Sequence, residues 1–317
     1  MTADTVLLVT TSYDPAPEYV GAALERRGFP FFRLNTDQFP SLVRAEFNPQ
    51  RGLTISDRRR SISGKQVKSV WYRRDVVPDL PDDLDPGTRD FCEREVRAFL
   101  GGTLAALPTQ RWLSSPQAIW RAERKPYQLA VAAQLGFTLP CTMVTNEPAV
   151  VREFAQERRL VAKAVSSSYI RSPGGNQAIF TNALTPADLE DLDGLALAPV
   201  IFQENVEKSS DIRVTVVGNE VFAAEILSQR RESSKVDWRA TDDPDLEHKT
   251  HELPSTLARR CLRLVSHLGL IFGAIDFALK PDGTYVFFEI NPNGEWLWLE
   301  DQLGFPISDR IAAWLCE

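Results

Sequence analysis

The segment that most constrains the fold of this chain is "FGAIDFALKPDGTYVFFEINPN", residues 272–293. Two apolar runs flank the turn sequence "PDG", a pattern typical of two antiparallel strands joined by a hairpin turn. In the second run, Glu289 and Asn291 are two residues apart, so both side chains face one side of an extended strand. By the same alternation, Phe288 faces the other side.

The turn decides whether Asp276 also faces Glu289. If Asp282 and Gly283 form a two-residue turn, Asp276 and Glu289 lie directly opposite each other on one face. Like charges in that position repel each other unless a cation lies between them. Two carboxylates and the carbonyl of Asn291 suit Mg²⁺ better than zinc.

Two alternatives stay open for this hairpin. The sequence "KPDGT" also suits a type I turn with a bulged glycine. That turn shifts the register by one residue and puts the two acids on opposite faces, unless a second bulge compensates. A solvated hairpin end without a metal ion is the other possibility.

Composition narrows the class of protein. A formal net charge of -7 over 317 residues argues against a broad nucleic-acid or membrane-surface footprint. The four cysteines are widely spaced, which indicates neither a zinc site nor a disulfide framework. No signal peptide and no apolar run of about 20 residues is evident. We expect a cytoplasmic protein with no membrane or nucleic-acid partner.

The N-terminal part reads as a β-α-β unit. "TVLLVTT" (5–11) resembles a buried strand, "APEYVGAALERRG" (16–28) has helical spacing, and "FPFFRLN" (29–35) resembles a second strand. This order implies a parallel sheet. Further strands are expected at 51–56 and 67–74, and a first domain at 1–113.

The remainder predicts a mixed α/β (α+β) architecture. Helices are expected from Pro116 to Gly136 and over 254–270, strands over 159–165, 177–184 and 198–206, and a hairpin with a Gly-Asn turn over 211–227. Residues 166–175, "SSSYIRSPGG", read as a flexible loop. We expect a central subdomain at 114–202 and a C-terminal subdomain at 203–317.

A magnesium site of this kind implies a nucleoside triphosphate, yet the chain has neither a P-loop nor a GxGxxG sequence after a strand. In this respect the chain resembles the ATP-grasp ligases. Their metal motif is an Asp on one strand and Glu-x-Asn on the next, which "AIDF" and "FFEINPNG" match. The resemblance spans residues 110 to 295, and less closely the N-terminal unit.

The resemblance implies a role for several other residues. Lys125 and Lys163 match the lysines that hold the ATP phosphates, and the 166–175 loop matches the segment that closes over them. The "QENV" sequence, with Glu204 and Val206, matches the hinge whose backbone pairs with adenine. Asp211 matches the acid that takes the ribose hydroxyls.

Arg213 lies on the same strand face as Asp211, two residues away. A guanidinium in that position could bind both an acyl phosphate and an incoming carboxylate, so we expect Arg213 to be catalytic. The alternative is a strand-surface arginine that pairs with Asp211.

A finer resemblance is to the microviridin-type, or graspetide, macrocyclases. The cues are "FRLNTDQFP", "VWYRR", "DIRV", "SQ…DWR" and "EINPNGEWLWLE". The resemblance implies an ATP- and Mg²⁺-dependent ligase that activates Asp or Glu side chains of a ribosomal precursor peptide. It then joins them to Thr, Ser or Lys side chains as esters or amides.

The resemblance also implies a leader segment and an acidic core as the peptide partner, and a homodimer is possible. Lys235, Arg239, His248 and Lys249 could hold an acidic core, or they could lie in a solvated loop. An amino-acid or peptide ligase of the glutamate-adding type stays an alternative. A nucleotide-binding module without catalysis is another.

Overall fold

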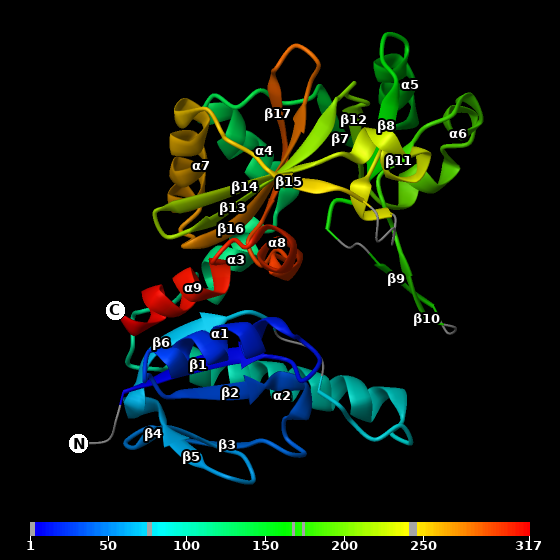
Figure 1. Cartoon of the computed structure of the whole chain (residues 1–317). Coiled ribbons are helices and arrows are strands. Elements are labelled where there is room, and N and C mark those ends of the chain that lie inside the picture. Colours follow the sequence, from blue (N-terminus) through cyan, green and yellow to red (C-terminus); the bar gives the residue numbers. More distant parts are fainter. Residues whose placement is uncertain (1–3, 75–77, 167–168, 173–174, 241–245) are drawn as a thin grey trace. The chain divides into compact units, whose positions relative to one another are not determined.

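The structure is a computed structural model that describes residues 4–74, 78–166, 169–172, 175–240 and 246–317. The chain forms two compact units: residues 1–116 with 306–317, and residues 117–305. Each unit is described by itself below, with the element labels of Figure 1.

The first unit is built on a parallel sheet with strand order β2-β1-β6. This confirms the parallel sheet expected from the β-α-β pattern. Apolar residues 6–9 of the central strand are fully buried, because both faces of the sheet are covered. A second, antiparallel sheet has the order β3-β4-β5. The elements of this unit are β1 (Thr5–Thr10), α1 (Ala16–Arg26), β2 (Phe31–Asn35), β3 (Arg44–Asn48), β4 (Gly52–Ser56), β5 (Ser61–Ser63), β6 (Val67–Tyr72), α2 (Pro86–Ala105) and α9 (Ile307–Cys316).

The C-terminal helix α9 belongs to the first unit, although the sequence assigned residues 306–317 to the C-terminal subdomain. Ile307, Ile311 and Leu315 form an apolar stripe at helical spacing, and all three are buried. The hydroxyl of Ser69 on β6 donates to the Leu315 carbonyl at 2.7 Å, which fixes the end of the helix. The three-part division at 113 and 202 stays a prediction.

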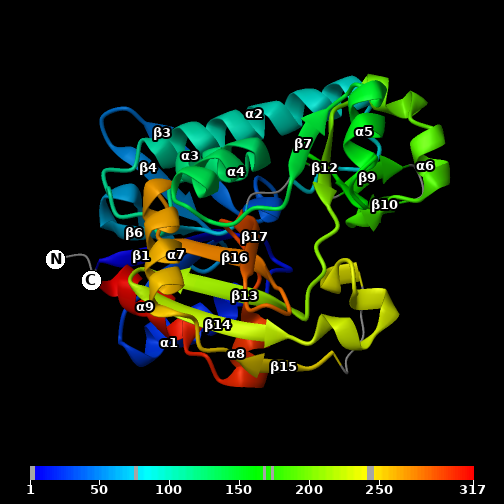
Figure 2. The ribbon, with the colours of Figure 1, turned by 90° about the horizontal axis from the view of Figure 1, so that it is seen from above.

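Among its described residues the second unit contains three sheets, and all their strand pairs are antiparallel. One is the two-stranded sheet β10-β9, one has the order β11-β8-β12-β7, and the largest has the order β15-β14-β13-β16-β17. Helix α7 lies against the largest sheet, where it buries Leu257, Cys261 and Leu264 (Figures 1 and 2). The elements of this unit are α3 (Pro116–Ala122), α4 (Lys125–Gln134), β7 (Thr142–Thr145), α5 (Pro148–Ala155), β8 (Leu160–Lys163), β9 (Tyr169–Ser172), β10 (Gly175–Ala178), β11 (Asn182–Ala183), α6 (Pro186–Glu190), β12 (Val200–Glu204), β13 (Ser210–Val217), β14 (Glu220–Ile226), β15 (His248–Thr250), α7 (Ser255–His267), β16 (Phe272–Leu279), β17 (Tyr285–Asn291) and α8 (Leu297–Leu303).

The segment expected as a loop at 166–175 contains regular structure. Strands β9 and β10 pair antiparallel, with Ser172 opposite Gly175. Residues 167–168 and 173–174 of this segment lie outside the described residues. The strand expected over 177–184 is also interrupted, since β10 ends at Ala178 and β11 spans only Asn182–Ala183.

The β16–β17 hairpin has the turn that the sequence analysis gave as the alternative. The Gly283 N–H donates to the Lys280 carbonyl at 2.9 Å, and Gly283 has a φ of 83°, as in a type I turn with a bulged glycine. A second bulge lies between Asp276 and Phe277, and it restores the pairing of Asp276 with Glu289. The expected two-residue turn was therefore wrong, but the expected pairing is present.

The bulge also changes which way Phe288 faces. It is the extra residue, because Phe287 pairs with Phe277 and Glu289 pairs with Asp276. A bulged residue breaks the alternation of side chains. Phe288 therefore lines the same small cavity as Glu289, instead of facing the opposite side as the strand pattern predicted.

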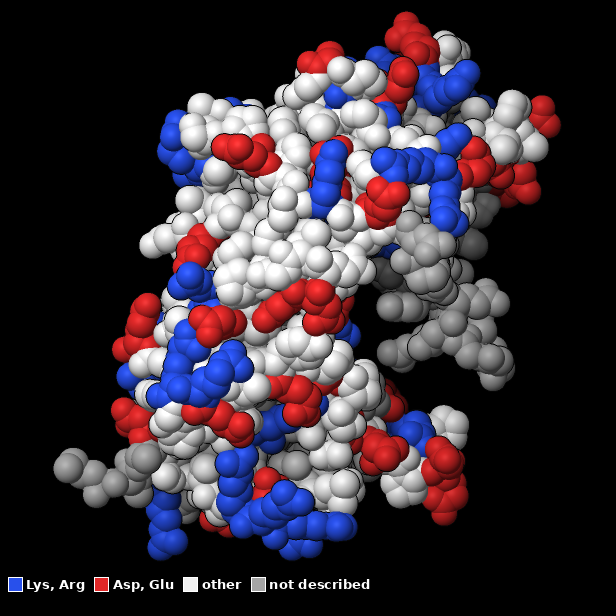
Figure 3. All heavy atoms as spheres, in the orientation of Figure 1, with Lys and Arg blue, Asp and Glu red and all other residues white. Residues whose placement is uncertain are grey.

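Charged side chains of both signs are interspersed over the face drawn in Figure 3, which agrees with the modest net charge. Among the described residues, no helix is long and apolar enough to cross a membrane.

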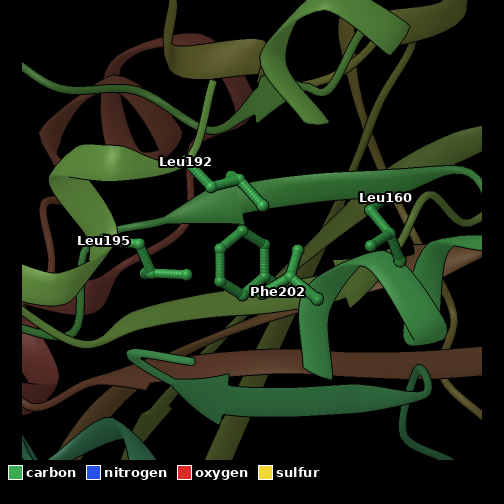
Figure 4. Close-up of a cluster of buried hydrophobic side chains, with 5 residues drawn as sticks. Leu160, Leu192, Leu195 and Phe202 are labelled. Carbon is green, nitrogen blue, oxygen red and sulfur yellow. The ribbon is translucent and has the colours of Figure 1, made fainter. Parts of the chain in front are cut away.

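A compact apolar cluster holds the four-stranded sheet of the second unit together. Figure 4 shows Leu160, Leu192, Leu195 and Phe202 packed against one another, and each is at most 8% exposed. Leu195 and Leu197 lie in the same 3-10 helix, Asp193–Leu197, but Leu197 is 90% exposed. The two leucines are therefore a matched pair for testing this core.

We predict that Leu195→Ala lowers the free energy of unfolding by about 2–5 kcal/mol, because it removes buried methyl groups and leaves a cavity. Leu197→Ala should change it by less than about 0.5 kcal/mol. Urea unfolding of the two variants measures the difference, and equal losses would contradict this packing.

Candidate functional site

Two adjoining cavities in the second unit hold most of the residues singled out from the sequence. The larger, of about 580 Å³, is lined by Lys125, Gln128 and Asn291 among others. The smaller, of about 40 Å³, is lined by the 203–206 hinge and Asp211. The side chains that line both cavities are Lys163, Thr181, Asp237, Arg239 and Glu289.

Asp276, Glu289 and Asn291 converge, as the hairpin pattern predicted. Asp276 and Glu289 are paired across neighbouring strands. The Asn291 amide nitrogen lies 3.3 Å from Asp276 Oδ2 and 3.5 Å from Glu289 Oε1. The buried Asp276 carboxylate and the partly buried Glu289 carboxylate, beside an amide carbonyl, form an oxygen donor set, which fits Mg²⁺.

Cationic side chains surround these two acids. The Arg213 Nε atom lies 3.0 Å from Asp276 Oδ1. Arg239 Nη1 donates to Glu289 Oε1 at 2.8 Å, and Lys125 Nζ lies 3.5 Å from Glu289 Oε2. Burial alone would raise the pKa of Glu289, but Arg239, Lys125 and Lys163 hold it well below its usual value. Burial raises the pKa of Asp276, against the opposing effect of Arg213 and Arg239.

Lys163 ends β8 and reaches into both cavities, with its ammonium 4.6 Å from the centre of the Phe288 ring. Burial lowers the pKa of Lys163 to about 8, and the nearby Arg239 and Lys125 add to the shift, whereas Glu289 opposes it. Lys125 begins α4, and its Nζ also donates to the Ala164 carbonyl at 3.2 Å. Both lysines thus lie where they could contact an anionic ligand.

The nucleoside-binding residues expected from the resemblance line the smaller cavity. The Glu204 N–H donates to the Cys141 carbonyl at 2.9 Å, so an adenine contact from Glu204 would have to use its carbonyl. Asp211 is buried, and its oxygens accept from Lys208 Nζ at 2.8 Å and from the Ser228 hydroxyl at 2.6 Å. Burial raises the pKa of Asp211, although Lys208 and Ser228 oppose that shift.

Arg213 is buried beside Asp276, which it faces across neighbouring strands. Its side chain is 4% exposed and pairs with Asp276, not with Asp211 as the alternative reading held. The guanidinium carbon lies 5.3 Å from the centre of the Trp238 ring. Arg213 thus contacts Asp276, a candidate metal ligand, directly. A contact with an acyl phosphate stays a prediction.

The basic residues expected between the two hairpins do not gather into one group. Lys235 pairs with Glu232, Lys249 pairs with Glu225, and the His248 ring lies 4.6 Å from that of Trp298. Arg239 alone lies at the cavities, because its neighbour Asp237 and the acid Glu289 both bind it.

Several residues of the site were not assigned a role from the sequence, among them Gln128, Lys208 and Asp237. The buried Gln128 amide accepts from the Ile290 N–H at 3.1 Å and donates to the Ile290 carbonyl at 2.8 Å, so it braces β17 between Glu289 and Asn291. Asp237 belongs to the "DWR" sequence, which carried the family resemblance without indicating a contact. No periodic pattern pointed to Gln128 or Lys208.

We predict that binding of ATP to this site takes up a proton near pH 8. Lys163 is partly neutral there, and a nearby phosphate favours its charged form and so raises its pKa. Affinity should therefore fall as the pH rises through about 8. Calorimetry in buffers of different ionisation enthalpy measures the uptake. Lys163→Arg should abolish it, and an unchanged uptake in that variant would contradict the assignment.

Comparisons with known proteins agree with this geometry. Residues 5–120 match the family described as the MvdD pre-ATP grasp domain. Comparison with curated proteins gives no match. The macrocyclase MdnC from Microcystis aeruginosa MRC, solved bound with the precursor peptide MdnA, is 36% identical over 98% of this chain and 99% of its own, with a TM-score of 0.89.

Two further solved structures are similar. A RiPP-associated ATP-grasp ligase from Chryseobacterium gregarium, in complex with ADP and a leader and core peptide, is 31% identical over 99% of this chain and 96% of its own, with a TM-score of 0.91. The ATP-grasp ligase PsnB, complexed with minimal precursor, Mg and ADP, is 22% identical over 98% of this chain and 96% of its own, with a TM-score of 0.77, and shares the fold.

These matches confirm the ATP-grasp fold that the metal motif and the two lysines indicated. The 36% sequence identity to MdnC extends over nearly the whole of both chains. The chain belongs to the graspetide-type macrocyclase family, and it is an ATP-grasp ligase.

Proposed function

We propose that this ligase cross-links a ribosomal precursor peptide through its own side chains. The observation that carries the proposal is the pairing of Asp276 with Glu289 at a cavity lined by Lys125, Lys163 and Arg239. Such an arrangement suits the transfer of a phosphoryl group, which depends mainly on positioning and on neutralising charge. Relatives solved with a precursor or a leader and core peptide support a peptide as the acceptor.

The proposed reaction has two steps. A carboxylate oxygen of a substrate Asp or Glu attacks the γ-phosphorus of ATP, forming an acyl phosphate and releasing ADP. A Thr or Ser hydroxyl, or a Lys amine, then attacks the acyl carbon. The bond between that carbon and the bridging oxygen breaks, and the oxygen leaves as part of inorganic phosphate. The incoming group gives up its proton. Each ester or amide thus consumes one ATP and removes the elements of water from the peptide.

The residues singled out from the sequence have proposed parts in these steps. Lys125 and Lys163 bind the phosphates, and their charge favours departure of ADP. The hinge backbone at Glu204 and Val206 binds adenine, and Asp211 orients the ribose together with Lys208. Mg²⁺ held by Asp276, Glu289 and Asn291 would neutralise phosphate charge and orient the γ-phosphate.

Arg213 is proposed to act through Asp276. The ion pair with Asp276 keeps that carboxylate in place, and the guanidinium is held in turn by the face of Trp238. Direct binding of the acyl phosphate by Arg213 is the further role that the resemblance implies. The homodimer stays a prediction.

We predict that the enzyme, ATP and Mg²⁺ lower the mass of an acidic precursor peptide by one water for each linkage. A suitable peptide is rich in Asp, Glu and Thr or Lys and retains its leader. Intact-mass spectrometry, with ADP measured in parallel, gives both the number of links and the ATP used for each.

Glu289→Gln should lower this rate by more than about 100-fold, since loss of even a residue that only supports a metal ligand costs 10–100-fold. The matched control is Glu232→Gln, in which the altered residue is exposed and pairs with Lys235 at the surface. A mass gain equal to an amino acid would favour the amino-acid ligase. ADP formation with no change in any peptide would contradict the macrocyclase.

A further inference from the structure

Arg239 is held at both ends by acids. Its Nε and Nη2 atoms donate to the two oxygens of Asp237 at 2.9 Å and 3.1 Å, and its Nη1 atom donates to Glu289 Oε1 at 2.8 Å. Asp237 is itself buried, and it accepts from the Thr181 N–H at 3.3 Å. The guanidinium therefore has one fixed anchor, Asp237, and one contact with a candidate metal ligand.

Arg239 lies where the nucleotide and the acceptor peptide would meet. It lines the small cavity, together with the hinge and Asp211, and also the large cavity, together with Lys125 and Asn291. A ligand whose nucleoside end lies at the hinge would carry its phosphates past this junction. The Arg239 side chain is 41% exposed, so its outer N–H groups are accessible from the cavities.

The contact with Glu289 opposes binding of a metal ion to the same carboxylate. A magnesium ion lies about 2.0–2.1 Å from its oxygen ligands, whereas Arg239 Nη1 lies 2.8 Å from Glu289 Oε1. One carboxylate oxygen can accept a hydrogen bond and bind a metal, but two positive charges so close together would repel each other. A metal ion held by Glu289 would therefore favour release of the guanidinium from that carboxylate.

We propose that Arg239 and the divalent metal compete for Glu289, and that Asp237 then holds the displaced guanidinium against the ATP phosphates. Arg239 is thus a phosphate-positioning residue, and Asp237 positions it. The inference rests on the phosphoryl-transfer part of the proposed function and not on the identity of the peptide. An arginine suits this task because its planar fork can keep two N–H groups on Asp237 while a third changes partner.

The test separates metal binding from nucleotide binding. Mn²⁺ serves as the probe for the metal, measured by electron paramagnetic resonance on the full-length enzyme. Without nucleotide, Arg239→Ala should tighten Mn²⁺ binding by about fivefold, because the competing ion pair is gone. With the non-hydrolysable analogue AMPPNP present, the same variant should bind the nucleotide about tenfold more weakly, because one charge-assisted hydrogen bond is lost.

A matched control and a second variant make the test specific. Arg230→Ala removes an exposed arginine that pairs with Glu247, and it should change neither affinity. Asp237→Asn keeps the Arg239 charge but weakens its anchor. It should therefore weaken AMPPNP binding without tightening Mn²⁺ binding.

Opposite signs of the two effects in Arg239→Ala would support the competition. Weaker or unchanged Mn²⁺ binding in that variant, without nucleotide, would overturn it. Failure of the wild-type enzyme to bind AMPPNP with Mn²⁺ would instead count against the phosphoryl-transfer function itself, so the two failures are distinguishable.

Discussion

The pairing of Asp276 with Glu289 is the constraint on which the rest of the site depends. Two acids opposite each other on neighbouring strands repel, so the fold must supply positive charge around them. Arg213 contacts Asp276, whereas Arg239 and Lys125 contact Glu289. A site that gathers this much charge around two carboxylates is suited to bind a metal ion and phosphates together. The metal ion can replace basic side chains beside the carboxylates, and the phosphates can replace the carboxylates beside the basic side chains.

The backbone that holds the two acids is itself irregular. A bulged turn shifts the register, and a second bulge at Phe288 shifts it back before Asp276 is reached. The second bulge also turns Phe288 into the small cavity, against the ammonium of Lys163. The one extra residue therefore aligns the candidate metal ligands, and its ring lines the cavity that holds the candidate nucleoside-binding residues.

The sequence predicted the parts of this structure that follow from local pattern. The β-α-β opening and the Gly-Asn hairpin could be predicted, because strand alternation and turn residues carry that information. The Asp276–Glu289 pairing was expected from a two-residue turn that the chain does not form, and it is present because a second bulge restores the register. The bulge at Phe288 could not be predicted, since no glycine or proline marks it and its cause lies in the pairing with β16. Helix α9 could not be assigned to the first unit, because its partners on β6 are more than 200 residues away in the chain.

The contacts of the site were harder to predict than its residues. Gln128 braces β17 from a helix, and Asp237 anchors Arg239 from a loop, so neither follows a periodic pattern. The resemblance to the ATP-grasp ligases supplied Lys125, Lys163 and the hinge in order along the chain. It did not indicate that Asp211 is held by Lys208 and Ser228, or that Arg213 is buried beside Asp276 and paired with it.

The central claim, that the hairpin register builds one metal site, is tested most directly by a crystal structure with Mn²⁺ and AMPPNP. Anomalous scattering locates Mn²⁺ independently of any refined side chain. We predict that the strongest anomalous peak lies between Asp276 and Glu289, within bonding distance of both carboxylates and next to Asn291. A peak bound to the phosphates but to neither carboxylate would contradict the account.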